Sequence, residues 1–175
     1  MTKKLLNTYA IILFTCLVTA FAFSTGCGVY SFADVSVPDS IKTVRLHFIE
    51  NQARYVNPQL SPNLTDRLKQ KIVNQTRLSQ TNSDNAHYDI SGYISDYTVT
   101  TSGISNRQNT TNRLTVRVII VLKNQLSNLE PQEFDISRSF EFGANLSLQA
   151  AESQLLDEMV RNLTDDIFNR IFSNW

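Results

Sequence analysis

The chain has 175 residues, with 16 basic and 16 acidic side chains, so its formal net charge is zero. This length suits one domain. The balanced charge argues against a protein that binds nucleic acid through an overall basic field.

The first 27 residues have the layout of a bacterial lipoprotein signal. Lys3 and Lys4 precede an apolar run over residues 11–23, which leads through small side chains to Cys27. This layout predicts that residues 1–26 are removed as a signal peptide and that Cys27 becomes a lipidated first residue. A plain secretory signal and an N-terminal membrane anchor are the alternatives. The apolar run is shorter than the about 20 residues that span a bilayer.

Loss of this segment defines the remaining chain. Removing 26 of 175 residues leaves 149, and the removed part carries two lysines and no acid, so the formal charge becomes −2. Cys16 leaves with the signal, and the lipid uses Cys27, so no disulfide is expected. A hydrophobic core must therefore stabilise the fold. Residues 27–40 are interpreted as a lipidated tether and residues 41–175 as a single domain.

The first part of that domain reads as a strand followed by a helix. Apolar and polar residues alternate over 41–49, which predicts a strand with Val44, Leu46 and Phe48 on one face. Ser61 and Pro62 then indicate a helix start, with Ser61 as the capping residue. An apolar stripe at i, i+4 spacing follows and predicts a helix ending near Leu78.

Three strands and a second helix complete the pattern. Alternation predicts strands over 87–100, 112–124 and 133–142, and short polar connections favour an antiparallel meander. Residues 147–174 carry a wide helical apolar stripe. The order β-α-β-β-β-α predicts an α+β two-layer sandwich, in which a mainly antiparallel four-stranded sheet carries both helices on one face.

The other face of the predicted sheet offers a candidate contact surface. It would carry Tyr93, Tyr97, Ile119 and Val121 among polar residues. An uncovered apolar and aromatic sheet surface is often a site of partner contact. The alternative is an ordinary surface, on which scattered apolar side chains are common.

The sequence contains no recognisable catalytic or metal-binding motif. It has no GxSxG, P-loop or GxGxxG pattern, and its two histidines, His47 and His87, fall in separate predicted strands. Asp165 and Asp166 are neighbours on a helix, so they point in different directions and do not form a facing acid–base pair. We therefore expect neither an enzyme nor a metal or cofactor site.

Three arginines are the sharpest candidates for ligand contact. Arg107, Arg113 and Arg117 lie at or near the 101–111 connection, among hydroxyl and amide side chains. Guanidinium groups in such a setting bind phosphate well. The preferred interpretation is a solvated hairpin with ordinary surface cations, and contact with a phosphate or an anionic lipid is the sharper alternative.

Short segments along the chain resemble one family. Cys27 is followed by GVYSF, as at the mature start of the lipopolysaccharide-assembly lipoproteins, the LptE family, in its Bacteroidota form. Residues 37–44 (VPDSIKTV) and 88–94 (YDISGYI) are similar to the family's first and second strands. The predicted order of elements also matches the family's fold.

The resemblance implies a non-enzymatic protein, lipid-anchored in the outer membrane and facing the periplasm. Such a protein would lie in the lumen of a large β-barrel, LptD, assist its assembly and plug it while lipopolysaccharide passes to the cell surface. The barrel is the implied partner and lipopolysaccharide a candidate ligand; no nucleic acid is implied. The many Asn, Gln, Ser and Thr residues suit a wet, polar lumen. The alternative is a stand-alone periplasmic lipoprotein that binds a small ligand or a cell-wall polymer in a concave apolar pocket.

Overall fold

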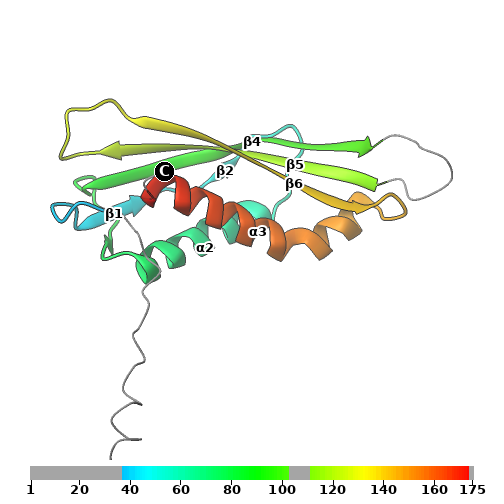
Figure 1. Cartoon of the computed structure of the whole chain (residues 1–175), viewed down its shortest axis with the longest axis horizontal. Coiled ribbons are helices and arrows are strands. Elements are labelled where there is room, and N and C mark those ends of the chain that lie inside the picture. Colours follow the sequence, from blue (N-terminus) through cyan, green and yellow to red (C-terminus); the bar gives the residue numbers. More distant parts are fainter. Residues whose placement is uncertain (1–36, 103–110, 174–175) are drawn as a thin grey trace, which may run out of the picture. The chain divides into compact units, whose positions relative to one another are not determined.

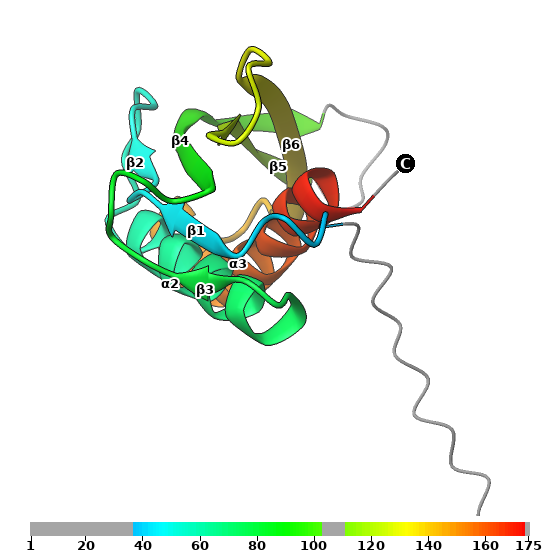
Figure 2. The same cartoon turned by 90° about the vertical axis from the view of Figure 1, so that its left-hand side faces the viewer.

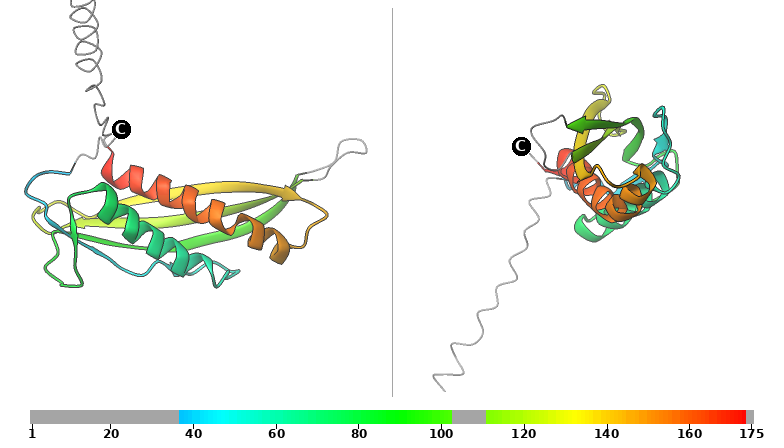
Figure 3. Two further views of the ribbon diagram at one scale, coloured as in Figure 1. Left: turned by 90° about the horizontal axis from the view of Figure 1, so that it is seen from below. Right: turned by 90° about the vertical axis from the view of Figure 1, so that its right-hand side faces the viewer.

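A computed structural model describes residues 37–102 and 111–173 (Figure 1). In chain order, the elements are β1 (Thr43–Leu46), β2 (Glu50–Asn51), α2 (Leu60–Gln75), β3 (Ser79–Gln80), β4 (Tyr88–Ser102), β5 (Thr111–Asn124), β6 (Gln132–Gly143) and α3 (Leu148–Phe172). Figures 1 and 3 show both helices on one side of the sheet. The predicted α+β arrangement is confirmed.

The sheet is larger than predicted, and it is mixed. It has six strands in the order β3-β1-β4-β5-β6, with β2 also paired to β4. The β4-β5-β6 meander is antiparallel as predicted, whereas β1 runs parallel to both β3 and β4, and β2 runs parallel to β4. Strands β1 and β3 are parallel and therefore need a crossover connection between them, which helix α2 provides. Strands β2 and β3 have two residues each, too few to show an alternating pattern.

The core fills the space between the sheet and the two helices. Its members are apolar side chains that alternate along the long strands or recur every three to four residues along the helices. Those that are at most 1% exposed include Ile90, Ile94, Leu114, Val116, Val118 and Ile120 from the sheet, Leu64, Leu68 and Ile72 from α2, and Met159, Leu163 and Ile167 from α3.

The alternation predicted for the first strand is wrong at its end. Phe48 is 53% exposed and Ile49 is fully buried. The strand stops at Leu46, although the His47 N–H still donates to the Ile90 carbonyl over 2.9 Å. Irregular residues before β2 shift the alternation by one position. The Ile49 N–H then turns toward the helix layer and donates to the Thr65 hydroxyl over 3.0 Å.

The predicted cap of the first helix is also wrong. Helix α2 begins at Leu60, and the Asn57 side-chain oxygen accepts from the N–H groups of Gln59 and Leu60 over 2.9 and 3.2 Å. Ser61 therefore lies inside the first turn. Pro62 is tolerated there because the first N–H groups of a helix have no partner within it. In α3 the side chain of Ser147 does cap, accepting from the Ala150 N–H over 3.2 Å.

Asp165 and Asp166 point in different directions, as predicted, and each has a basic partner. Asp165 lies 2.5 Å from the Lys71 ammonium of α2, and Asp166 accepts two bonds from Arg138 of β6, over 2.5 and 2.7 Å. These pairs join α3 to its two neighbours.

Several predictions lie outside the described residues. They are the signal peptide, the lipidation of Cys27, most of the 27–40 tether and the position of Arg107. Among the described helices, neither combines the length and apolar character needed to cross a membrane.

Candidate partner-binding face

A bulge in β4 decides which side chains reach the outer surface of the sheet. We call this surface, opposite the helices, the open face. The register of β4 against β5 shifts between Ile94 and Asp96. One extra residue reverses the alternation, so residues at odd positions face the core beyond the bulge. Tyr97 is consequently 4% exposed and packs in the core. Its predicted place on the open face is wrong.

The other three predicted contact residues do share the open face. Tyr93 of β4 lies directly opposite Ile119 of β5, and Ser91 lies opposite Val121. All four side chains are partly exposed. Tyr93, Ile119 and Val121 form a small apolar patch near the middle of the sheet.

Beyond this patch the open face is a ladder of polar pairs between β5 and β6. The hydroxyls of Thr115 and Ser139 lie 2.9 Å apart. On one side of them Arg113 donates to Glu141 over 3.1 Å, and on the other Arg117 lies 3.7 Å from Asp135. Cross-strand pairs of this kind stabilise a sheet. They also present hydrogen-bonding groups of both kinds to a partner.

The structure places two of the three predicted arginines on this ladder. The side chains of Arg113 and Arg117 are 49% and 51% exposed. Each already has a carboxylate partner, so an incoming phosphate would compete with Glu141 or Asp135. In residues 37–102 and 111–173, no group of three or more His, Cys, Asp or Glu side chains could hold a metal ion.

At the other edge of the open face is a charge cluster that sequence reasoning missed. Parallel pairing sets Arg45 of β1 beside Asp89 of β4. Arg45 donates to Asp89 over 2.8 Å and also pairs with Asp84, and the His47 ring nitrogen lies 2.8 Å from Asp89. The bonds from Arg45, and then from His47, hold the pKa of Asp89 below its usual value against the opposing effect of burial. Only the parallel register brings these groups together.

Comparison with known proteins assigns the chain to a family. The family model of LptE, described as lipopolysaccharide-assembly, matches residues 41–171. The chain belongs to the LptE family. This confirms the resemblance seen in the short sequence segments. No curated protein matches the chain in sequence.

Solved structures similar to this LptE-family chain have low sequence identity. A neuraminyllactose-binding hemagglutinin homolog from Helicobacter pylori aligns with a TM-score of 0.53 at 7% identity, covering 78% of this chain and 86% of that one. A minor lipoprotein from Acinetobacter baumannii aligns with a TM-score of 0.45 at 17% identity, covering 75% and 93%. Lipoprotein B from Nitrosomonas europaea aligns with a TM-score of 0.42 at 19% identity, covering 76% of this chain and 84% of that one. The first of these supports the fold alone.

A second cluster that sequence reasoning missed lies on the core side of this LptE-family sheet. Glu152 of α3 is 8% exposed and accepts from the hydroxyls of Tyr97 and Tyr55, over 2.7 and 3.2 Å. Burial, and then the bond to Glu152, raise the pKa of Tyr97 well above its usual value. The sequence carries a signal for this cluster. Leu148, Leu156 and Val160 lie on one face of the helix at i, i+4 spacing, and Glu152 is the charged residue within that apolar series.

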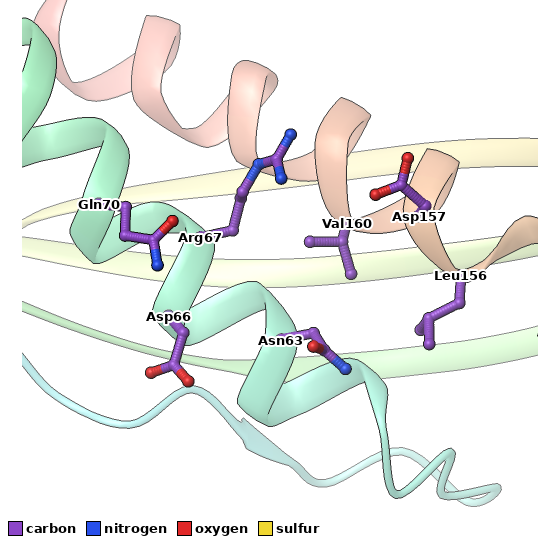
Figure 4. Close-up of a pocket in the computed structure, with 7 residues that line it drawn as sticks. All are labelled: Asn63, Asp66, Arg67, Gln70, Leu156, Asp157 and Val160. Carbon is purple, nitrogen blue, oxygen red and sulfur yellow. The ribbon is translucent and has the colours of Figure 1, made fainter.

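The helix layer of the LptE-family chain has a polar cleft of about 370 Å³ (Figure 4). Its lining comes from the outer sides of α2 and α3: Asn63, Asp66, Arg67, Gln70, Leu156, Asp157 and Val160. Most of these side chains are exposed and polar. The cleft therefore differs from the enclosed apolar pocket expected of a small-ligand binder.

Proposed function

We propose that this LptE-family chain is an outer-membrane lipoprotein that assists the assembly of an LptD-type β-barrel and plugs its lumen during lipopolysaccharide delivery. The observation that carries this proposal is the family match over residues 41–171, which spans nearly the whole described domain. In this role the protein acts by binding and needs no catalytic group.

The anchor in this proposal is Cys27. Removal of residues 1–26 frees the cysteine at the start of the chain, and its acyl chains hold the protein in the membrane. Several acyl chains hold far better than one. A Cys27→Ala variant should therefore fail to incorporate labelled palmitate and should leave the membrane fraction, while the fold of residues 41–175 stays intact.

The contact surface in this proposal is the open face. A barrel lumen is polar and wet, and the Arg113–Glu141 and Arg117–Asp135 pairs already balance their charges. Docking these four side chains against such a wall leaves each of their charges with a partner, which limits the cost of desolvation. The patch of Tyr93, Ile119 and Val121 supplies apolar contact area at the centre.

We further propose that Arg113 and Arg117 contact phosphate groups of lipopolysaccharide by exchanging their carboxylate partners. Arg138 offers a matched control, because it is 48% exposed and paired with Asp166, but it contacts the helix layer. Replacing Arg113 and Arg117 together by Gln should weaken binding to immobilised lipopolysaccharide and lower its salt dependence. Arg138→Gln should change neither. An equal loss of lipopolysaccharide binding in the double variant and in Arg138→Gln would contradict a specific role for the open face.

Co-purification tests the partner. Tagged protein is recovered from detergent-solubilised outer membranes, and whatever accompanies it is identified by mass spectrometry. We expect a large β-barrel in stoichiometric amount. Recovery of the lipoprotein alone, under conditions that keep other barrel complexes intact, would contradict the plug role. It would favour the stand-alone periplasmic lipoprotein.

A further inference from the structure

The β5–β6 connection displays two leucines to solvent. Leu126 is 56% exposed and Leu129 is 75% exposed. Polar side chains hold the backbone between and around them: the Leu126 N–H donates to the Asn124 side chain over 3.0 Å, and the Leu129 N–H donates to the Ser127 hydroxyl over 3.1 Å. The turn is thus fixed locally, and neither leucine is used to pack it against the core.

We call Leu126, Leu129 and the turn between them the leucine tip. It lies at the end of the sheet where the described chain begins. The Gln125 N–H donates to the His87 carbonyl over 2.8 Å, and the His87 ring accepts from the Lys42 N–H over 3.0 Å. Lys42 directly follows a turn closed by the Ile41 N–H and the Pro38 carbonyl, 2.9 Å apart. Figure 1 shows the yellow β5–β6 connection and the blue start of β1 at one end of the sheet, and Figure 2 looks onto that end.

The length of chain between Cys27 and Val37 limits how far this end can move from an anchor. The ten intervening steps span at most about 33–36 Å when fully extended. A lipid on Cys27 would therefore keep the leucine tip within reach of the bilayer surface. Because the acyl chains and the tip share one molecule, even a weak apolar contact is favoured by a high effective concentration.

We propose that Leu126 and Leu129 insert into the surface of the bilayer that holds the Cys27 lipid, so that the domain is attached at two points. The proposal rests on the lipid anchor of the proposed function. A bilayer suits this tip better than a protein does. Two leucines on a convex turn offer little shape for a protein to match, whereas a bilayer accepts apolar side chains without shape complementarity. The tip is flanked by exposed Lys123, Glu130 and Glu133, whose signs are mixed. The contact is therefore apolar and does not depend on anionic lipid.

A label beside the leucines tests the insertion. The mature protein, lipidated at Cys27 and carrying Asn128→Cys, is labelled with an environment-sensitive fluorophore and reconstituted into phosphatidylcholine vesicles, with or without nitroxide-labelled lipid. Asn128 is exposed and lies between the leucines. We expect a blue shift of the emission and a loss of intensity with the nitroxide lipid. Both effects should disappear when Leu126 and Leu129 are replaced by serine.

Gln149→Cys serves as the matched control, because Gln149 is exposed and belongs to the first turn of α3. Helix α3 begins at the opposite end of the sheet (Figure 1). Its label should show neither effect. Equal signals from the two positions, or an unchanged signal in the double serine variant, would overturn the insertion. A blue shift at position 128 that requires a co-reconstituted barrel and resists the nitroxide lipid would overturn it in favour of a protein contact.

Flotation of the same vesicles separates this proposal from the anchor itself. Protein that fails to float with the lipid contradicts the lipidation of Cys27. Protein that floats but gives no lipid quenching at position 128 contradicts the leucine contact alone. Because both leucines are exposed, the double serine variant should unfold at the same temperature as the parent protein.

Discussion

Tyr97 donates its phenolic hydrogen to Glu152 over 2.7 Å, and this bond joins the strand beyond the β4 bulge to the first turns of α3. Both side chains are buried, and Tyr55 stacks on Tyr97 with ring centroids 5.4 Å apart while donating to the same carboxylate. The bulge turns Tyr97 from the open face into the core. The open face loses one aromatic side chain, and the helix layer gains a fixed polar contact.

Tyr97→Phe should destabilise the domain by about 1–2 kcal/mol, because the change leaves a buried carboxylate with one hydrogen bond fewer. Urea unfolding measures this loss as a lower midpoint with an unchanged slope. Tyr55→Phe is the control: Tyr55 is 43% exposed and its bond to Glu152 is longer, at 3.2 Å. Its loss should be smaller, and the reverse order of the two variants would contradict the assignment.

The raised pKa of Tyr97 predicts a loss of stability in alkali. A group whose pKa is higher in the folded state contributes its stability fully at a pH below its pKa in the unfolded chain, which is near 10.0 for tyrosine. That contribution is lost as the pH rises toward the pKa in the folded state. Unfolding measured from pH 8 upward should show this decline beginning at about pH 10. The decline should be shallower in Tyr97→Phe. The pKa of Tyr55 and Tyr88 is also raised, so some decline should remain.

Gly92→Ala should be strongly destabilising. A Cβ at this position would lie 2.5 Å from the backbone oxygen of Ile119 and 2.6 Å from the side chain of Ile120, in the centre of the sheet. The neighbouring strand must move, which costs about 1–3 kcal/mol or more. Gly143→Ala is the matched control, since its Cβ would meet only the Asn145 side chain within 3.4 Å. Thermal unfolding should rank Gly92→Ala well below Gly143→Ala, and similar values would contradict the close approach.

Much of the fold follows from the sequence because its long elements repeat their pattern many times. Strands β4, β5 and β6 and helix α3 were all predicted, and the apolar positions of β5 alternate without interruption from Leu114 to Leu122. The short elements could not be predicted in this way. Strands β2 and β3 are held by their partners rather than by any pattern of their own.

The side chains whose direction was predicted wrongly, Phe48 and Tyr97, share one cause, which is a local change of strand register. An irregular step before Ile49 moved Phe48 outward, and the β4 bulge moved Tyr97 inward. Neither step is marked by a glycine or a proline. The open face itself was predicted through Tyr93, Ile119 and Val121, whereas the Arg45–Asp89 contact depends on a parallel pairing that alternation does not reveal.

Asp89→Asn should lower stability at neutral pH by about 1 kcal/mol, because it weakens the charge-assisted bonds from Arg45 and His47. The pKa of Asp89 is lowered in the folded state, so its contribution is present above the unfolded value of about 3.8 and is lost as the pH falls through the folded pKa. The difference between parent and variant should therefore shrink in acid unfolding experiments. A difference that grows below pH 4 would contradict this sign.

Site-specific photo-crosslinking in the outer membrane tests most directly whether the open face meets a barrel. A photoreactive residue replaces Ile119 in one protein, at the centre of the open face, and Arg67 in another, on the outer side of α2. If the open face docks against the barrel wall, the residue at position 119 should yield an adduct with a large β-barrel, identified by mass spectrometry, and the residue at position 67 should yield much less of it. A barrel adduct from position 67 alone, or from neither position while both proteins remain in the membrane, would contradict docking through the open face.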